Sequence, residues 1–242
     1  MNNGIPAVDK SVQILEMLAE APASQGELSK ALGISMSTAY RILQTLACRD
    51  WVKKDDRGTY FLASGVLTLF KPFDRDLEIL KRARHKVDEL CCLCHTACKL
   101  SLRRGNLQIT EYRAEPEGPV TLTGVPGSTF PLAEGSVGAA LLADDSDENI
   151  LSCLAGCSAP IPEKKDPELL KSAVAEVRRN NCVLNMSNNR WNIAALSVPL
   201  RNSSGRIFAA LTLIGSAGDF AGNRRKKYEE LLKKAVFECE SM

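Results

Sequence analysis

The segment from residue 24 to residue 48 limits the fold of this chain more than any other, because it predicts two helices around a tight turn. It opens with Ser24 followed three residues later by Glu27, the spacing of a capping box that starts a helix. Gly33 then favours a turn, and Ser35 can cap the second helix. A helix, a glycine-containing turn and a second helix are typical of a helix-turn-helix.

The second of these helices has one apolar face and one face rich in hydroxyl groups. Its apolar positions recur at helical spacing and are Ala39, Ile42, Leu43 and Leu46. The opposite face presents Ser37, Thr38, Arg41, Gln44 and Thr45. Short hydroxyl side chains allow a close approach to DNA, while Arg41 can reach a phosphate or a guanine and Gln44 can pair with adenine. We therefore expect this face to contact the major groove of double-stranded DNA.

A helix before this segment and a hairpin after it complete the pattern of a winged helix. The apolar positions of the preceding helix, which Pro22 ends, are Val8, Val12, Leu15 and Leu18. The runs Trp51–Lys54 and Thr59–Leu62 resemble short strands, and the Asp and Gly residues between them suit a hairpin turn. Three helices followed by a two-stranded hairpin are typical of a winged helix-turn-helix.

Positive charge is concentrated in the part of the chain that is expected to face DNA. Residues 30–60 hold six basic and three acidic residues, a net charge of +3, whereas residues 1–29 hold one basic and four acidic residues, a net charge of −3. We predict that Lys53, Lys54 and Arg57 of the hairpin also contact DNA. This distribution favours DNA binding over a winged helix that contacts only proteins.

Two runs in this region resemble a known family. The run Ala7–Leu15 and the run Gly33–Leu46, with Ser37-Thr38 before Tyr40-Arg41, resemble the isocitrate-lyase-regulator (IclR) family of transcription factors. The resemblance covers residues 5–70. It implies a ligand-responsive regulator that binds a pseudo-palindromic DNA operator as a homodimer or a tetramer.

The rest of the chain indicates a second domain of mixed helices and strands. Residues 74–90 predict an amphipathic helix that links the two domains or begins the second one. Strands are expected at 100–103, 107–112, 120–123, 182–185, 193–200 and 207–213, and helices at 136–143, 147–154, 167–180 and 223–238. The hairpin signal Asn202–Gly205 indicates an antiparallel sheet. We expect an α+β protein with a DNA-binding domain over 1–73, a linker helix over 74–90 and a sheet domain over 91–242.

This second region resembles the effector-binding domain of the IclR family, a relative of the GAF fold. The clearest pieces are Gly135–Ala143, Ile193–Leu200 and Gly205–Leu213. The resemblance implies a pocket on the sheet for a small organic acid or an aromatic metabolite. By position, the effector-binding residues are Ser136, Val137, Asn185, Ile193 and Thr212. Ordinary sheet core is the alternative for each of them.

Two departures from the family pattern bear on the identity of the effector. Ala139 stands where the family has a lysine, and the loop after Asn185, which ends at Trp191, is rich in amides where the family has acidic residues. These differences indicate a different effector, so we name none.

A cluster of cysteines offers a second possible mode of control. Cys91, Cys92, Cys94, His95 and Cys98 lie within eight residues. Three interpretations are open. The cysteines can be plain core and surface thiols, they can be redox sensors, or they can be ligands of zinc or of an iron–sulfur cluster. Because no second well-spaced Cys/His pair follows, we assign no metal site and no cofactor. We expect Cys92 to be the exposed thiol. A redox- or metal-responsive regulator acting through Cys91–Cys98 is the alternative to a ligand-responsive one.

Catalysis and membrane insertion find little support. The chain has no Gly-x-x-x-x-Gly-Lys loop and no His-Glu-x-x-His motif, and it holds two histidines. The alternative from another functional class is a GAF-like cysteine enzyme, but nucleophilic catalysis by cysteine requires a base close to the thiol. We therefore assign no catalytic residue and expect a protein that is not an enzyme. No apolar run reaches the length of a membrane helix and no secretory signal is present, which predicts a cytoplasmic protein without a membrane partner.

Overall fold

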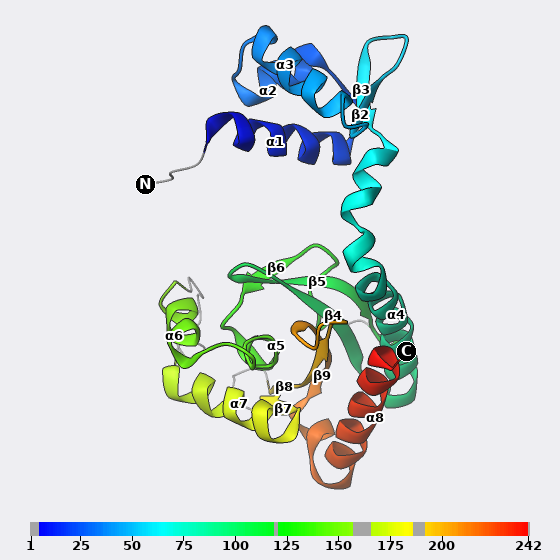
Figure 1. The fold of residues 1–242 in the computed structure, drawn as a ribbon. Coiled ribbons are helices and arrows are strands. Elements are labelled where there is room, and N and C mark those ends of the chain that lie inside the picture. The colour runs from blue at the N-terminus through cyan, green and yellow to red at the C-terminus, as the bar shows by residue number, and fades with distance from the viewer. Residues whose placement is uncertain (1–4, 119–120, 157–165, 186–191, 242) are drawn as a thin grey trace. The chain divides into compact units, whose positions relative to one another are not determined.

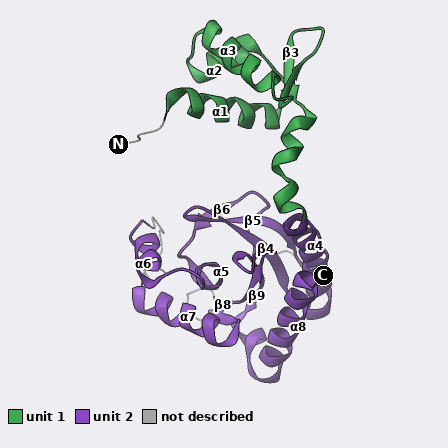
Figure 2. Ribbon diagram, viewed as in Figure 1, with its two compact units in different colours: residues 1–74 green, residues 75–242 purple. Residues whose placement is uncertain are grey.

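The computed structural model describes residues 5–118, 121–156, 166–185 and 192–241. Its contacts divide the chain into two compact units, Met1–Asp74 and Arg75–Met242 (Figure 2). None of the helices in the described ranges combines the length and the apolar character that crossing a membrane requires.

The first unit is a winged helix, as the sequence predicts (Figure 1). Its helices are α1 (Pro6–Glu20), α2 (Gln25–Leu32) and α3 (Met36–Ala47), followed by the 3-10 turns η1 (Ser64–Leu69) and η2 (Lys71–Phe73). Its strands are β1 (Ala23–Ser24), β2 (Val52–Lys54) and β3 (Thr59–Leu62), in the antiparallel order β1-β3-β2. The short strand β1, which pairs Ala23 with Tyr60, was not predicted and ties the start of α2 to the wing.

The caps that define the helix-turn-helix form as the local sequence requires. The backbone N–H of Glu27 donates to Ser24 Oγ at 3.3 Å, and the Glu27 carboxylate accepts from the Ser24 N–H at 2.7 Å. Gly33 ends α2 with φ of 62°, a left-handed conformation that glycine adopts without steric cost. Ser35 Oγ accepts from the backbone N–H of Thr38 at 3.1 Å and starts α3. The capping-box prediction is thereby confirmed.

The predicted apolar face of α1 is wrong in its first half. Ile14 is fully buried and Leu18 is 4% exposed, but Val8 and Val12 are 57% and 48% exposed. At about 100° per residue, Val8 and Val12 lie roughly a third to a half of a turn from Ile14. The helix thus turns the Ile14 side toward the core of the unit, rather than the side that begins with Val8.

The second unit is an antiparallel sheet covered by helices on both faces (Figure 1). Its strand order is β6-β5-β4-β9-β8-β7. The strands are β4 (Ala97–Arg104), β5 (Leu107–Ala114), β6 (Thr129–Pro131), β7 (Val183–Asn185), β8 (Ile193–Arg201) and β9 (Ile207–Ser216). The helices are α4 (Asp74–Cys94), α5 (Gly135–Leu141), α6 (Asp147–Ala155), α7 (Pro167–Asn180) and α8 (Gly222–Glu240), with the 3-10 turn η4 (Ala217–Phe220) before α8. This arrangement confirms the α+β class.

One predicted strand, over residues 120–123, is wrong for the residues that the structure describes. Residue 120 lies outside the described ranges, and residues 121–123 form no strand. The backbone of Thr123 bonds to side chains instead: its N–H donates to the Glu115 carboxylate at 2.9 Å, and its carbonyl accepts from the Arg113 guanidinium at 2.8 Å. The sheet edge is formed by β6, which pairs Gln108 with Phe130.

The two faces of the sheet differ in character. Helices α4 and α8 cover one face, where Leu100, Leu196 and Leu211 are fully buried in an apolar cluster. Helices α5 and α7 pack toward the other face with a second apolar cluster that includes Leu141 and Val174. The strand residues on this second face include several buried polar side chains, among them Ser101, Ser197 and Thr212. The candidate ligand site is on that face.

Candidate functional site

The two faces of α3 are separated as the sequence predicts. Ala39 and Leu43 are fully buried, and Ile42 and Leu46 are 8% and 5% exposed. The five predicted DNA contacts on this helix are all exposed: Ser37, Thr38, Arg41, Gln44 and Thr45. The structure therefore presents them together on one outward-facing surface of the first unit.

The hydroxyl groups of this surface are held by local hydrogen bonds, while its two long side chains are not. Ser35 Oγ lies 2.9 Å from both Ser37 Oγ and Thr38 Oγ1, and Thr45 Oγ1 donates to the Arg41 carbonyl at 2.8 Å. Neither the Arg41 guanidinium nor the Gln44 amide bonds to another described residue. Both ends are available to an external partner.

The wing offers three further cations, one of which is already paired. Lys53 Nζ lies 3.1 Å from an Asp50 carboxylate oxygen. Lys54 Nζ lies 5.5 Å from the centre of the Tyr60 ring, within the range of a cation–π contact. Arg57 is exposed at the tip of the hairpin. Since exposed ion pairs are weak, the pairing of Lys53 does not remove it as a candidate phosphate contact.

In the second unit, two of the five predicted effector residues are joined through a residue that the sequence reasoning missed. Ser197 Oγ donates to Ser136 Oγ at 2.9 Å and lies 2.8 Å from Thr212 Oγ1. Ser136 is 2% exposed, and Ser197 and Thr212 are fully buried. The three hydroxyl groups connect α5 to the centre of the sheet across β8 and β9.

The other three predicted effector residues belong to α5, β8 and β7. Val137, on α5, is buried in the second apolar cluster, and Ile193 is half-buried at the start of β8. Asn185 is the last residue of β7 and pairs with Ala195. The remainder of the predicted amide-rich loop, residues 186–191, lies outside the described residues. Ala139, where the family has lysine, is fully buried among apolar side chains.

Sequence reasoning also missed Lys99 and Ser101 of β4, which lie on the same buried face and are 7% and 1% exposed. In the sequence these residues alternate with Cys98, Leu100 and Leu102, a pattern typical of a strand with one solvated face. Elements distant in the sequence cover that face, among them β6, whose Phe130 ring centre lies 5.2 Å from Lys99 Nζ. No local signal encodes that covering.

The cysteine cluster is divided between core and surface. Cys91, Cys94 and Cys98 are buried and Cys92 is exposed, as predicted. Burial raises the pKa of Cys94 to about 11, and it raises the pKa of Cys91 and, more strongly, of Cys98. No group of three or more Cys, His, Asp or Glu side chains in the described ranges is arranged to hold a metal ion. Thiols that resist deprotonation are poor nucleophiles and poor redox sensors.

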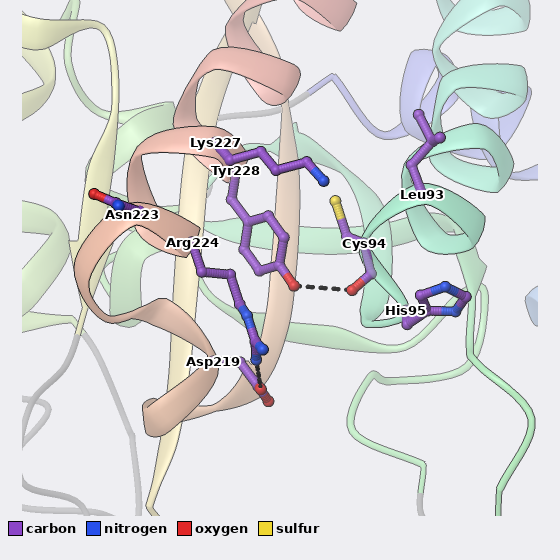
Figure 3. Close-up of a pocket in the computed structure, with 8 residues that line it drawn as sticks. All are labelled: Leu93, Cys94, His95, Asp219, Asn223, Arg224, Lys227 and Tyr228. Atoms are coloured by element: carbon purple, nitrogen blue, oxygen red, sulfur yellow. Dashed lines mark hydrogen bonds and ion pairs between the residues drawn. The ribbon is translucent and has the colours of Figure 1, made fainter.

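A cavity of about 500 Å³ lies beside Cys94, on the side of the sheet covered by α4 and α8 (Figure 3). It is lined by Leu93, Cys94, His95, Asp219, Asn223, Arg224, Lys227 and Tyr228. The Tyr228 hydroxyl donates to the Cys94 carbonyl at 2.9 Å, and Arg224 pairs with Asp219 at 2.7 Å. The Tyr228 bond holds the end of α4 against α8, and the Arg224 pair ties the start of α8 to η4. No predicted effector residue lines this cavity.

Thiol modification should distinguish the members of the cluster. In the native protein we expect iodoacetamide to modify Cys92 and Cys48, which are exposed, and to leave Cys98 unmodified, because only an accessible thiolate reacts. Peptide mass spectrometry after timed labelling measures the labelling rate of each cysteine. In protein unfolded by denaturant, these rates should become equal. Labelling of Cys98 at the rate of Cys92 would show that the α4–sheet packing opens readily.

Together, a winged helix with an exposed recognition face and an α+β unit with a buried polar face define a transcriptional regulator with a separate regulatory domain. Family models support this directly: residues 7–56 match the IclR helix-turn-helix domain, and residues 75–239 match the C-terminal domain of the bacterial transcriptional regulator IclR. The chain belongs to the IclR family of transcriptional regulators, which confirms the resemblance seen in its sequence.

Individual relatives are distant in sequence but similar over most of their length. The HTH-type transcriptional repressor AllR of Salmonella typhimurium is 22% identical over 237 residues, which cover 95% of this chain and 87% of AllR. The IclR-type regulator of Alicyclobacillus acidocaldarius has the same fold, with a TM-score of 0.62, 22% identity and 98% of each chain covered. An IclR homologue of Microbacterium hydrocarbonoxydans, solved with 4-hydroxybenzoate, gives a TM-score of 0.62 at 19% identity, with 97% of each chain covered. These relatives do not favour the redox, metal or enzyme alternatives.

Proposed function

We propose that this regulator binds double-stranded DNA through α3 and the wing, and that a small organic acid or aromatic metabolite bound in its sheet domain changes that affinity. The observation that carries the DNA-binding proposal is the exposed face of α3, on which the Arg41 guanidinium and the Gln44 side-chain amide have no partner within the described chain. The proposed contacts are Ser37, Thr38, Arg41, Gln44, Thr45, Lys53, Lys54 and Arg57. The DNA-binding domain in this proposal is residues 1–73.

For the effector, we assign residues 91–242, with the helix over 74–90 between the two domains. The proposed ligand contacts are Ser136, Val137, Asn185, Ile193 and Thr212. The buried hydroxyl groups of Ser136 and Thr212, both bonded to Ser197, support this location. The 4-hydroxybenzoate bound by the Microbacterium homologue supports an aromatic acid as one candidate class.

A homodimer or a tetramer completes the proposal, because a two-fold protein recognises a two-fold operator. The ligand acts by binding one arrangement of the oligomer more tightly than the other, since only differential affinity shifts such an equilibrium. The protein acts in the cytoplasm, where its operator lies, and it needs no catalytic step.

Selection from a library of random DNA duplexes with the full chain tests this proposal. We expect the selected duplexes to share two half-sites related by two-fold symmetry, with centres separated by about 10 base pairs or a multiple of that distance. Adding candidate acids to the bound complex should then change the affinity for the selected duplex. Selected duplexes without a common sequence would contradict sequence-specific binding.

A further inference from the structure

The β8–β9 turn, residues 201–207, is held by carboxylates from three other parts of the sheet domain. Each carboxylate accepts one backbone N–H of the turn: Glu240 of α8 from Arg201 at 2.6 Å, Asp76 of α4 from Ser203 at 2.9 Å, and Asp144 from Ile207 at 2.9 Å. The turn closes without them, since the Asn202 N–H donates to the Arg206 carbonyl at 2.8 Å and the Asn202 side chain accepts two further N–H groups. The three carboxylates therefore connect the turn to its surroundings rather than shape it.

Asp76 lies at the point where the chain leaves the sheet domain. The first compact unit ends at Asp74, so Asp76 is the second residue of the second unit and belongs to the first turn of α4. It is 9% exposed, whereas its neighbours Asp74 and Arg75 are exposed. Burial of a carboxylate is costly unless the group is bonded, and here the Ser203 N–H supplies a bond. The β8–β9 turn thus holds the end of α4 that follows the DNA-binding unit in the sequence.

Asp144 connects the same turn to α5. It lies three residues after Leu141, the last residue of that helix, and besides the Ile207 N–H its carboxylate accepts from Arg201 Nη1 at 3.0 and 3.1 Å. Helix α5 begins at the proposed ligand site with Ser136, and all its residues from Ser136 to Leu141 are buried. Closely packed interiors transmit strain, so a displacement at the start of α5 also displaces the residues that follow it.

The β8–β9 turn is placed to move when its attachments move. The register of the β8–β9 ladder shifts between Leu200 and Arg201, and an irregularity of this kind disrupts the ladder locally. Residues 203–206 are exposed, so a movement of the turn does not require buried side chains to repack. Segments with few buried contacts and an exposed backbone are the ones that change conformation at low cost.

We propose that the β8–β9 turn couples the ligand site to α4, with Asp144 and Asp76 as the positioning residues on its two sides. A ligand that displaces the start of α5 moves Asp144, Asp144 moves the turn, and the turn moves the first turn of α4 through Asp76. Ligand and operator then bias the same element between two arrangements, which is the physical requirement for coupling between distant sites. This inference rests on the proposed function, since it names the route by which the ligand acts.

Operator affinities of full-length variants test this route. The ligand site is perturbed in two ways, by 4-hydroxybenzoate and by Ser136→Val, which removes the bond to Ser197. We expect a perturbation to change the operator affinity of the unchanged protein by roughly fivefold or more, and that of Asp76→Ala by less than about twofold. The reason is that Asp76→Ala removes the acceptor of the Ser203 N–H. In the absence of DNA, calorimetry should give the same affinity for 4-hydroxybenzoate in Asp76→Ala as in the unchanged protein.

Asp76→Asn and Asp74→Ala are the matched controls. Asp76→Asn keeps an acceptor oxygen, and Asp74→Ala removes the same charge from an exposed carboxylate two residues away, so both should keep the full change in operator affinity. Asp144→Ala, at an exposed position, is the second test and should lose the change as Asp76→Ala does. If either alanine variant of the route keeps the full change, or if either control loses it, the route is overturned while ligand control stands. If neither perturbation alters the operator affinity of the unchanged protein, ligand control in the proposed function fails and the route fails with it.

Discussion

Replacing Arg41 by alanine is expected to lower the affinity for each half-site of the selected operator by roughly 5- to 150-fold, a loss of about 1–3 kcal/mol per recognition helix. The reason is that Arg41 is exposed on α3 and its guanidinium bonds to no other described residue, so it can bind a guanine edge at two points. Quantitative gel-shift titration on the selected duplex and on variants of each base pair measures the loss. The Arg41→Ala protein should lose its sequence preference at one base pair in each half-site.

Lys54→Ala provides the comparison that identifies a base contact. Lys54 is exposed on β2 and is expected to contact a phosphate. Its loss should weaken binding to all sequences about equally and should reduce the slope of log affinity against log salt concentration by about one unit for each subunit that contacts the DNA. If Arg41→Ala behaves in the same way, without any change in sequence preference, Arg41 is a phosphate contact. If Arg41→Ala leaves affinity unchanged, α3 is not the recognition helix.

The first unit was predictable because its determinants are local in the sequence. The capping box at Ser24, the left-handed turn at Gly33 and the cap at Ser35 each act within a few residues, and the structure contains all three. The three-residue spacing of Ala39 and Ile42 and their neighbours then fixes which side of α3 is buried. The error on α1 arose because Val8, Val12 and Leu15 form an equally regular stripe beside Ile14. Only the packing partners decide between two such faces.

The ligand site was predictable only in part, because it is assembled from elements that are distant in the sequence. The contacts of Ser197 with Thr212 and Ser136 depend on the register of β8 and β9 and on the placement of α5. Periodicity predicts each strand, but it does not predict the strand order or the helix that covers a face. Ser136 and Thr212 were identified through family resemblance, whereas Lys99 and Ser101 have the alternation of a solvated strand. These two side chains are buried because of the order of the strands and the elements that cover this face, and neither is encoded in the alternation along β4.

Replacing Gly138 by alanine is expected to damage the sheet domain, because there is no room for a side chain at this position of α5. An added Cβ would lie 2.2 Å from the carbonyl oxygen of Leu132 and 3.0 Å from the carbonyl carbon of Ala133, both of which are backbone atoms. Helix α5 must therefore shift, and Ser136 shifts with it. Overpacking of this kind typically costs about 1–3 kcal/mol. For a domain of this size that corresponds to a fall in unfolding temperature of roughly 2–12 °C.

Gly156→Ala is the matched control within the same domain. Gly156 follows α6 with φ of −78°, and an added Cβ would meet its nearest atoms at 3.7 and 3.8 Å, an ordinary contact distance. Alanine should be tolerated there and should stabilise the fold slightly by restricting the unfolded chain. Thermal unfolding followed by circular dichroism compares the two variants. A Gly138→Ala protein that unfolds at the same temperature and keeps its response to the ligand would show that α5 can move freely, and the bond between Ser136 and Ser197 would then not be needed to hold the site.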